Sequence, residues 1–319
     1  MKIIIGLIIL CTVIMLILNK LYMRTNYYRN SILQVDKFIK GVPKDLEIVN
    51  TGSSYARFAL DYDYTKLKGF NFGLQPQSLS YDFRILKQYK DNLKEGCKVL
   101  IVLPDFVFSF LDYKTEIHNI KYYYFLKENY ILNFSKLKRS IYTNLPLLSS
   151  LNPKIIILKT LKIFKDSKKN KEFDFEENKL KKEKVKLAAK NRVCGWKKEF
   201  NLPQNLNEEI SEELVLTFNK TTKLLQEIIE YCLGNNWKPI LVVPPCSSEL
   251  NELLPKNLIK KVLYDNIEKA NKRNIPLLSY LYDEKFQDSS LYIDSDRLNK
   301  KGREKFTKKV IEDMEEKGI

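Results

Sequence analysis

The sequence predicts an α/β fold: a three-layer, flavodoxin-like parallel sheet with helices on both faces, a helical insertion and an N-terminal transmembrane helix. Two observations support this prediction. Short apolar runs rich in β-branched residues alternate with amphipathic helical stretches, which is typical of a parallel sheet covered on both faces. The chain also begins with a long uncharged run. Its 319 residues, 44% of them hydrophobic, are enough for one large core and an inserted subdomain.

The N-terminal run predicts a membrane anchor over residues 1–23. Ile3–Leu18 is uncharged and mostly aliphatic, and with the next five residues it reaches the roughly 20 that cross a bilayer. A cleavable signal peptide competes, but no small-x-small site follows the run, and Leu10 before Cys11 does not fit a lipoprotein signal. We therefore expect an uncleaved anchor that contacts the bilayer through residues 3–23. Basic residues flank both ends, so charge does not determine its orientation.

The remaining elements are expected in the following order. Residues 24–45 form a stalk, and residues 46–112 and 204–319 form the α/β domain. Residues 113–203 form a mostly helical, lysine-rich insertion, because a structureless connection of that length is implausible in a compact domain. The expected strands lie in five apolar runs: DLEIVNTGSS, GFNFGLQPQS, KVLIVLPDF, WKPILVVPPCSSE and NIPLLSY. Apolar periodicity predicts helices over residues 78–95, 208–235 and 254–272.

The formal net charge of +16 is unevenly distributed. Between Lys159 and Phe200 there are 15 Lys or Arg and 7 Asp or Glu residues, so half of the excess lies in one segment. A solvated arm and a polyanion-binding arm both fit this segment, and the uneven charge does not predict a nucleic-acid partner. The five cysteines form no CxxC pair and His118 is the only histidine, so we expect free thiols, no metal site and no cofactor.

In a parallel sheet, ligands bind beyond the carboxyl ends of the strands, so the residues that follow each apolar run are the candidates for a site. The first run ends in Gly52, Ser53 and Ser54 before a predicted helix. Such a position fits a nucleophile or an oxyanion pocket, and it equally fits a plain helix N-cap. The other residues that follow apolar runs are Gly73 to Ser78, Pro104 and Asp105, Pro244 to Ser248, and Asp294 to Asn299.

Several of these blocks together resemble the SGNH/GDSL hydrolase superfamily. The blocks are TGSS, NFGLQPQSLSYDF, VLIVLPDF, PILVVPPCSSEL and DSDRLNKKGREKF, and they occur in the family's order over most of residues 46–306. The sequence looks most like the membrane-anchored members encoded with cell-surface polysaccharide genes, and like the D-alanyl-lipoteichoic acid biosynthesis proteins. The resemblance implies acyl-ester hydrolysis or transfer in the cell envelope, with the main domain outside the membrane.

The resemblance also implies roles for individual residues. Ser54 matches the nucleophile, and Asp294 matches the residue that orients the base. The implied oxyanion and substrate-binding residues are Gly52, Ser53, Gly73, Gln77 and Asp105.

Arg297 stands where the family has its histidine base. A guanidinium stays protonated and only donates hydrogen bonds, so it cannot accept the proton of Ser54. Two oxyanion positions are also changed, to Pro76 and Pro104, which have no backbone N–H. His118 in the insertion, or the carboxylates of the terminal block, remain as other bases, although a carboxylate with an ordinary pKa is poorly matched to a serine. Arg297 itself either binds an anionic group or pairs with Asp294.

Three hypotheses follow. The protein is an esterase or O-acyltransferase for surface polysaccharide or teichoic acid that uses an unconventional base. Alternatively, it is a catalytically degenerate relative that binds glycan or a membrane acyltransferase partner in the same cleft. The third hypothesis is a tethered basic protein whose lysine-rich arm binds anionic polymer or lipid.

Overall fold

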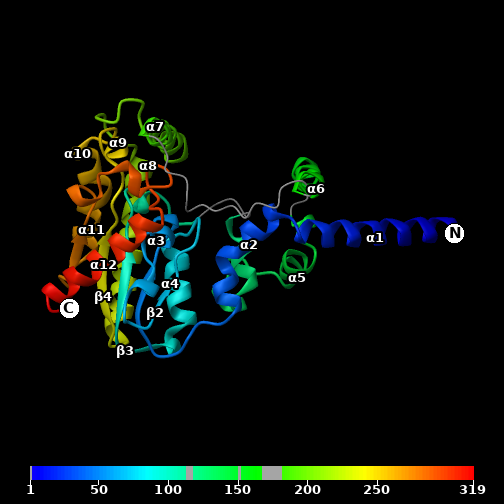
Figure 1. Cartoon of the computed structure of the whole chain (residues 1–319), viewed down its shortest axis with the longest axis horizontal. Helices are drawn as coiled ribbons and strands as arrows, with labels where there is room; N and C mark the ends of the chain where they lie inside the picture. The colour runs from blue at the N-terminus through cyan, green and yellow to red at the C-terminus, as the bar shows by residue number, and fades with distance from the viewer. Residues whose placement is uncertain (1, 113–117, 150–151, 167–181) are drawn as a thin grey trace. The chain divides into compact units, whose positions relative to one another are not determined.

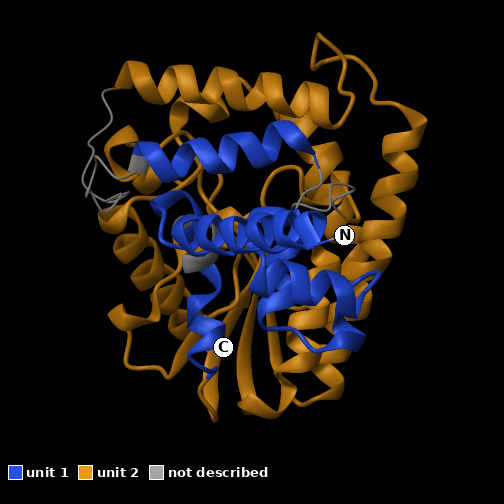
Figure 2. Cartoon of the chain, turned by 90° about the vertical axis from the view of Figure 1, so that its right-hand side faces the viewer, with its two compact units in different colours: residues 1–42, 114–174 blue, residues 43–113, 175–319 orange. Residues whose placement is uncertain are grey.

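The computed structural model describes residues 2–112, 118–149, 152–166 and 182–319, and the chain forms two compact units (Figure 2). Unit 1 comprises Met1–Val42 and Lys114–Asp174, and unit 2 comprises Pro43–Tyr113 and Phe175–Ile319.

Unit 2 is built on a five-stranded, fully parallel sheet with the strand order β2-β1-β3-β4-β5 (Figure 1). This is the flavodoxin-like order, so the predicted fold class is confirmed. In register, Val49 lies beside Val99, and Leu100 lies beside Ile240. Four strands fall within the predicted apolar runs: β1 Leu46–Thr51, β2 Gly69–Asn71, β4 Lys238–Val243 and β5 Leu277–Ser279. The fifth, β3 Leu93–Val102, begins five residues before the run KVLIVLPDF, so the helix predicted over residues 78–95 ends earlier than expected, at Gln88.

Helices cover both faces of this sheet, which explains why the strands lack an alternating polar face. On one face, Ile48, Leu100 and Ile240 form a core with side chains of α3 and α12. The alternate residues Val49, Val99 and Leu241 point to the other face and are fully buried. There α8 contacts β4, and α4 and α11 pack against α8. The α-helices of unit 2 are α3 Ser54–Ala59, α4 Leu79–Gln88, α7 Lys182–Glu199, α8 Glu212–Gly234, α9 Ser248–Asn251, α10 Lys256–Ile259, α11 Asp265–Ala270 and α12 Lys300–Glu316.

Short turns complete unit 2. A π-helical turn, η8 (Lys260–Tyr264), joins α10 to α11, so the helix predicted over residues 254–272 is built from three pieces. The 3-10 turns of the unit are η1 Tyr62–Tyr64, η2 Lys90–Asn92, η3 Val107–Ser109, η9 Glu284–Phe286 and η10 Ser289–Leu291.

Helix α12 starts with Asn299 as its N-cap residue. The Asn299 side chain accepts a hydrogen bond from the Gly302 N–H at 3.0 Å and donates one to the Ser290 carbonyl at 2.7 Å. A Cβ on Gly302 would lie 2.2 Å from the Leu291 carbonyl oxygen, so only glycine fits there. Phe306 is fully buried in the core. These residues of the terminal block therefore have structural roles.

Unit 1 contains the N-terminal helix and part of the predicted insertion. Among the described residues, α1 is the helix that is long and apolar enough to cross a membrane. Asn19 is the first buried residue of α1. The Asn19 amide donates to the Asn144 carbonyl at 2.9 Å and accepts from the Leu147 N–H at 3.0 Å. The helices of the unit are α1 Lys2–Met23, α2 Asn26–Ile39, α5 Lys136–Asn144 and α6 Pro153–Asp166, with 3-10 turns η5 Ile120–Tyr124, η6 Glu128–Tyr130 and η7 Pro146–Leu148.

The boundaries of the two units differ from the domain boundaries expected from the sequence. Residues 24–42 of the expected stalk belong to unit 1, with residues 114–174 of the expected insertion. Residues 175–203 of that insertion belong to unit 2, because α7 packs there through its face of Val185, Ala189, Val193 and Trp196. Within the insertion, residues 113–117, 150–151 and 167–181 lie outside the described residues, and the last range is the middle of the lysine-rich arm.

All five cysteines are free thiols in this structure. Cys97, Cys232 and Cys246 are buried, whereas Cys11 and Cys194 are exposed.

Candidate functional site

The loops that follow β1, β3 and β4 lie at the carboxyl edge of the sheet, as the parallel pairing requires. The terminal block reaches the same edge, because the Ser247 N–H after β4 donates to the Ser295 carbonyl at 3.0 Å. Helix α3 after β1 also meets it: the Arg297 guanidinium carbon lies 5.4 Å from the centre of the Phe58 ring. The elements that carry Ser54 and Asp294 therefore meet at one edge.

Ser54 is the first residue of α3, and Ser53 is its N-cap residue without a side-chain cap bond. Both side chains are partly exposed. Within the described ranges, the Ser54 hydroxyl makes no hydrogen bond to another side chain. Ser54 is therefore partly accessible at the edge of the sheet, and none of the described side chains accepts its proton in a hydrogen bond.

Gly52 makes the sharp turn between β1 and α3. Its φ is +124°, and a Cβ there would lie 2.8 Å from the Ala56 Cβ, so a side chain is excluded. The Gly52 N–H donates to the Asp82 carboxylate at 2.8 Å, and the Gly52 carbonyl accepts from the Gln77 amide at 3.2 Å. The Gln77 amide also donates to Asp82 at 2.5 Å. Burial raises the pKa of Asp82 to about 7, although these two bonds act in the opposite direction.

The donors predicted for an oxyanion hole are therefore engaged inside the protein. Gly52 donates to Asp82, the Gln77 amide donates to Asp82 and to backbone carbonyls, and the Gly73 N–H donates to the Asn71 side chain at 2.8 Å. These residues hold the turn before Ser54 in place. These hydrogen bonds to Asp82 were not predictable from the sequence, because Asp82 lies in α4, 30 residues after Gly52.

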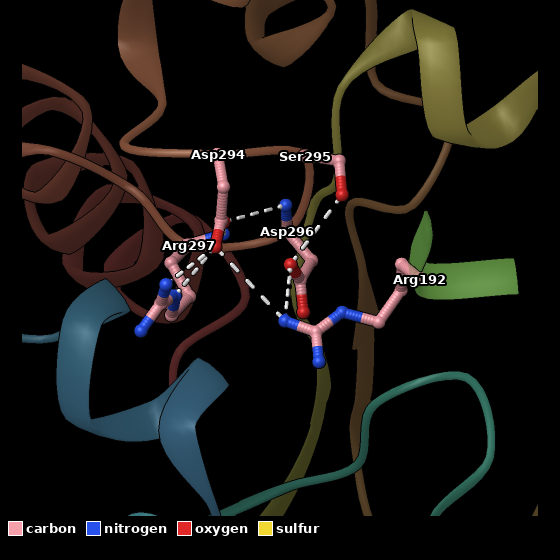
Figure 3. Close-up of polar contacts among 5 residues, drawn as sticks. All are labelled: Arg192, Asp294, Ser295, Asp296 and Arg297. Carbon is pink, nitrogen blue, oxygen red and sulfur yellow. Dashed lines mark hydrogen bonds and ion pairs between the residues drawn. The ribbon is translucent and has the colours of Figure 1, made fainter. Parts of the chain in front are cut away.

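Asp294 and Arg297 form a close ion pair (Figure 3). The Arg297 Nη2 lies 2.6 Å and its Nε 2.8 Å from Asp294 Oδ2, and the Arg297 backbone N–H donates to Oδ1 at 3.0 Å. The turn that carries both residues is closed by the Ile293 N–H, which donates to the Arg297 carbonyl at 2.7 Å. Burial raises the pKa of Asp294, but the bonds from Arg297 outweigh it and leave the pKa below its usual range. The pairing left open by the sequence is the one observed.

A second arginine enters this edge from α7. The Arg192 Nη2 donates to Asp296 Oδ1 at 2.9 Å and lies 4.0 Å from Asp294 Oδ2, so two arginines face two aspartates (Figure 3). Asp296 is buried. Burial first, and then the charge of Asp294, raise the pKa of Asp296 to about 6, while Arg192 acts against this rise.

Asp105 follows β3 and is also buried. Burial, and then the charge of Asp296, raise its pKa to about 7, although Tyr55 and Arg192 nearby favour its charged form. Buried oxygens without a hydrogen-bond partner in the described part of the chain concentrate in the loops after the strands: Thr51 Oγ1, Tyr55 OH, Gln77 Oε1, Asp105 Oδ2, Ser247 Oγ and Asp296 Oδ2. We call these six residues the buried polar cluster. Such groups are costly without a partner, so they are candidates for binding a polar ligand.

Sequence reasoning missed Arg192. One signal pointed to it: Arg192 is the only arginine between Lys159 and Phe200, where the other 14 basic residues are lysines. Arginine suits a paired position because its fork of donors matches a carboxylate, whereas lysine suits a solvated surface.

Two further sequence expectations concern His118 and metals. His118 belongs to unit 1, where its carbonyl accepts a hydrogen bond from Lys121, and burial lowers the pKa of its imidazole. Its role as a base for Ser54 stays a prediction. Within the described ranges, no group of three His, Cys, Asp or Glu side chains is arranged to hold a metal ion.

Comparison with known proteins does not identify the function, so the function is argued from the residues of the site. No family model matches the sequence, and no curated protein matches it. A crystal structure described as a candidate acylhydrolase from Bacteroides fragilis is similar to this chain at 12% identity and a TM-score of 0.38, over 89% of this chain and 96% of that one.

Proposed function

We propose that this chain is a membrane-anchored, SGNH/GDSL-like protein of the cell envelope that binds polysaccharide or teichoic-acid-like polymer at the carboxyl edge of its sheet, without the usual serine-dependent acyl transfer. The observation that carries this proposal is the Asp294–Arg297 ion pair, in which the position of the catalytic base holds a group that only donates. The apolar helix α1 supports the anchor, and the order of the sequence blocks supports the relationship to the hydrolases.

The surroundings of Ser54 support loss of catalysis on a second ground. A serine nucleophile needs a proton acceptor, and its tetrahedral intermediate needs donors that are available to it. The Gly52, Gly73 and Gln77 donors bind within the protein instead. With the base replaced and these donors engaged, the same edge retains a function in binding.

Two features support a polymer ligand. The buried polar cluster contains Asp296, beside the Asp294–Arg297 pair, and the oxygens of the cluster named above lack hydrogen-bond partners in the described part of the chain. The described part of the lysine-rich arm carries exposed lysines on α7, and these match an anionic polymer: Lys182, Lys184, Lys186, Lys190 and Lys198. A membrane acyltransferase that modifies such a polymer is the protein partner that this proposal implies, with the main domain outside the membrane.

A serine-reactive fluorophosphonate tests the loss of catalysis. The full chain in detergent micelles is treated with the probe between pH 6 and pH 9, beside a Ser54→Ala variant. We expect equal, background labelling of both proteins, because Arg297 at the position of the base cannot accept the Ser54 proton. Labelling that disappears in Ser54→Ala would overturn the proposal in favour of an active serine enzyme.

A polymer-binding assay tests the proposed binding of anionic polymer. Retention of purified teichoic acid is compared for the wild type and a Lys182→Ser/Lys186→Ser/Lys190→Ser variant. Binding that falls by an order of magnitude and depends on salt would support an electrostatic contribution of the arm. Binding that is unchanged would remove the arm from the proposal and with it the hypothesis of a merely basic, tethered protein.

Residual catalysis is the second candidate, and the raised pKa of Asp105 favours it. A carboxyl group with a pKa of about 7 is better matched to proton transfer than one with an ordinary value. If Ser54 is labelled, an Asp105→Asn variant separates the two cases. Labelling that needs Asp105 and rises through about pH 7 supports Asp105 as the base, whereas labelling independent of Asp105 excludes it.

A further inference from the structure

Unit 1 carries an apolar surface on α6. Ile157, Leu158, Leu161 and Phe164 are 58%, 45%, 52% and 65% exposed. Their spacing places them on one side of the helix, within about a third of its circumference at 3.6 residues per turn. Large apolar side chains that are adjacent and exposed indicate a surface that contacts something.

The opposite side of α6 is already used to hold the helix in unit 1. Ile163 packs against a cluster of Tyr22, Tyr28 and Leu147. The buried Lys159 ammonium donates to the Pro146 carbonyl at 2.9 Å and to Ser149 Oγ at 2.7 Å. Burial lowers the pKa of Lys159 to about 8. The helix is therefore anchored by one side, and Ile157, Leu158 and Leu161 lie on the side that faces away from these contacts.

The length of α1 indicates what covers this side. Residues 3–18 project from unit 1 and are mostly exposed, whereas Asn19 and Tyr22 are buried in it. At 1.5 Å per residue, these 16 residues span about 24 Å, about 6 Å less than the roughly 30 Å hydrocarbon core of a bilayer. The next turn, residues 19–22, supplies that length. Asn19 and Tyr22 of this turn pack into unit 1, so the surface that the unit presents there reaches the edge of the hydrocarbon.

Helix α6 is in the right place and has the right flanks. It contacts α1, and the Lys159 ammonium lies 5.5 Å from the centre of the Tyr22 ring. Figure 1 shows α1 lengthwise and α6 nearly end-on, so α6 crosses α1 instead of continuing beside it. The exposed lysines Lys154 and Lys165 lie in the first and last turns of the same side. Lysines can extend from such a position to lipid headgroups while the apolar side chains between them enter the acyl region.

We propose that α6 is an in-plane membrane helix, whose side chains Ile157, Leu158, Leu161 and Phe164 insert into the bilayer surface beside α1. This inference rests on the proposed membrane anchoring by α1 and goes beyond it, because it assigns a second membrane contact to a segment 130 residues away in the chain. The contact fixes the rotation of unit 1 about α1 and sets its depth in the membrane.

Site-directed fluorescence tests this assignment in the full chain reconstituted into vesicles. Cys11 in α1 and Cys194 are the exposed native thiols. A small thiol-reactive fluorophore is placed at Cys11, at Leu161→Cys or at Leu216→Cys, each time with the other exposed cysteines replaced by serine. Leu216 is a matched control, because it is a leucine of unit 2 that is 61% exposed on α8. Phe164→Cys provides a second site on α6.

The quenchers are nitroxide groups on lipid acyl chains and iodide in the water. We expect acyl-chain quenching to remove roughly half of the fluorescence at Cys11, at position 161 and at position 164, and to leave position 216 unchanged, since interfacial helices insert about 5–10 Å. Iodide should quench position 216 alone.

Each other outcome contradicts the proposal in a distinguishable way. Lipid quenching at Cys11 without quenching at positions 161 and 164 would leave the anchor and remove the α6 contact. Protection of both α6 positions from lipid and from iodide would show that a protein covers this side. Absence of lipid quenching at Cys11 would reject the anchor and the α6 contact together.

Discussion

Replacing Arg192 by alanine removes the side chain that pairs with the buried Asp296. The Arg192 Nη2 is 2.9 Å from Asp296 Oδ1, and the Asp296 side chain is 1% exposed, so no solvent replaces the lost partner at the carboxylate. Removing one partner of a buried pair costs about 3–5 kcal/mol. Because the Arg192 side chain is itself 35% exposed, its charge is partly screened, and we expect a loss of about 2 kcal/mol at pH 8.

The size of this loss should depend on pH. The folded-state pKa of Asp296, about 6, lies above the ordinary value of 3.8, so its contribution to stability is full below the lower value and is lost as pH rises through the higher one. Arg192 opposes the rise in this pKa, so Arg192→Ala should raise it further. At pH 5 the variant can keep Asp296 protonated and neutral, and the loss of stability should be small.

Urea denaturation followed by tryptophan fluorescence measures this effect. Trp196 lies one turn after Arg192 on α7, with its ring centre 4.7 Å from that of Phe106, and so reports the docking of α7. A Trp237→Phe background leaves Trp196 as the only tryptophan. Asp296→Asn is the matched control, because it removes the buried charge. Two results would refute the reasoning: equal losses at pH 5 and pH 8, or a loss from Arg192→Ala that is the same in the Asp296→Asn background.

Three further predictions concern the turn before Ser54 and the final helix. Gly52→Ala should destabilise unit 2 by about 2–4 kcal/mol in thermal unfolding, because the φ of +124° is strained for alanine and the new Cβ would lie 2.8 Å from the Ala56 Cβ. An unchanged melting temperature would contradict the described turn. Asp82 has a raised folded-state pKa of about 7, so the stability of the wild type should fall between pH 5 and pH 8. The Asp82→Asn variant keeps the acceptor oxygen and should flatten that fall. An equal pH dependence of the two proteins would show that other groups cause the fall. Asn299→Ala should cost about 1 kcal/mol through loss of the cap on α12, whereas Asn299→Ser should restore most of it if capping is the reason.

The sequence was sufficient to predict the sheet and its carboxyl edge. Runs such as VLIVLP and PILVV are apolar throughout, so they predict buried parallel strands without knowledge of their partners. The structure confirms these strands and brings the loop with Asp294 to the loop after β4 through Ser247 and Ser295. The cap at Asn299 was also predictable, because an N-cap depends on residues within one helical turn.

The internal use of the donors near Ser54 was not predictable from the sequence. Gly52 and Gln77 look like ligand-binding residues by position, but they bind Asp82, whose partners are determined by the packing of α4. Arg192 is 104 residues from Asp296, and its role follows from where α7 docks. Local patterns do not determine such long-range pairs, and the division of the insertion between two units depends on them as well.

We propose that Ser54 is inactive because Arg297 occupies the position of its base. The rate of fluorophosphonate labelling in Arg297→His, compared with the wild type and with Arg297→His/Ser54→Ala, tests this claim most directly. A histidine restores a group that accepts a proton near neutral pH. We predict that Arg297→His is labelled faster than the wild type, and that this labelling disappears when Ser54 is also replaced. Equal labelling of Arg297→His and the wild type would contradict it.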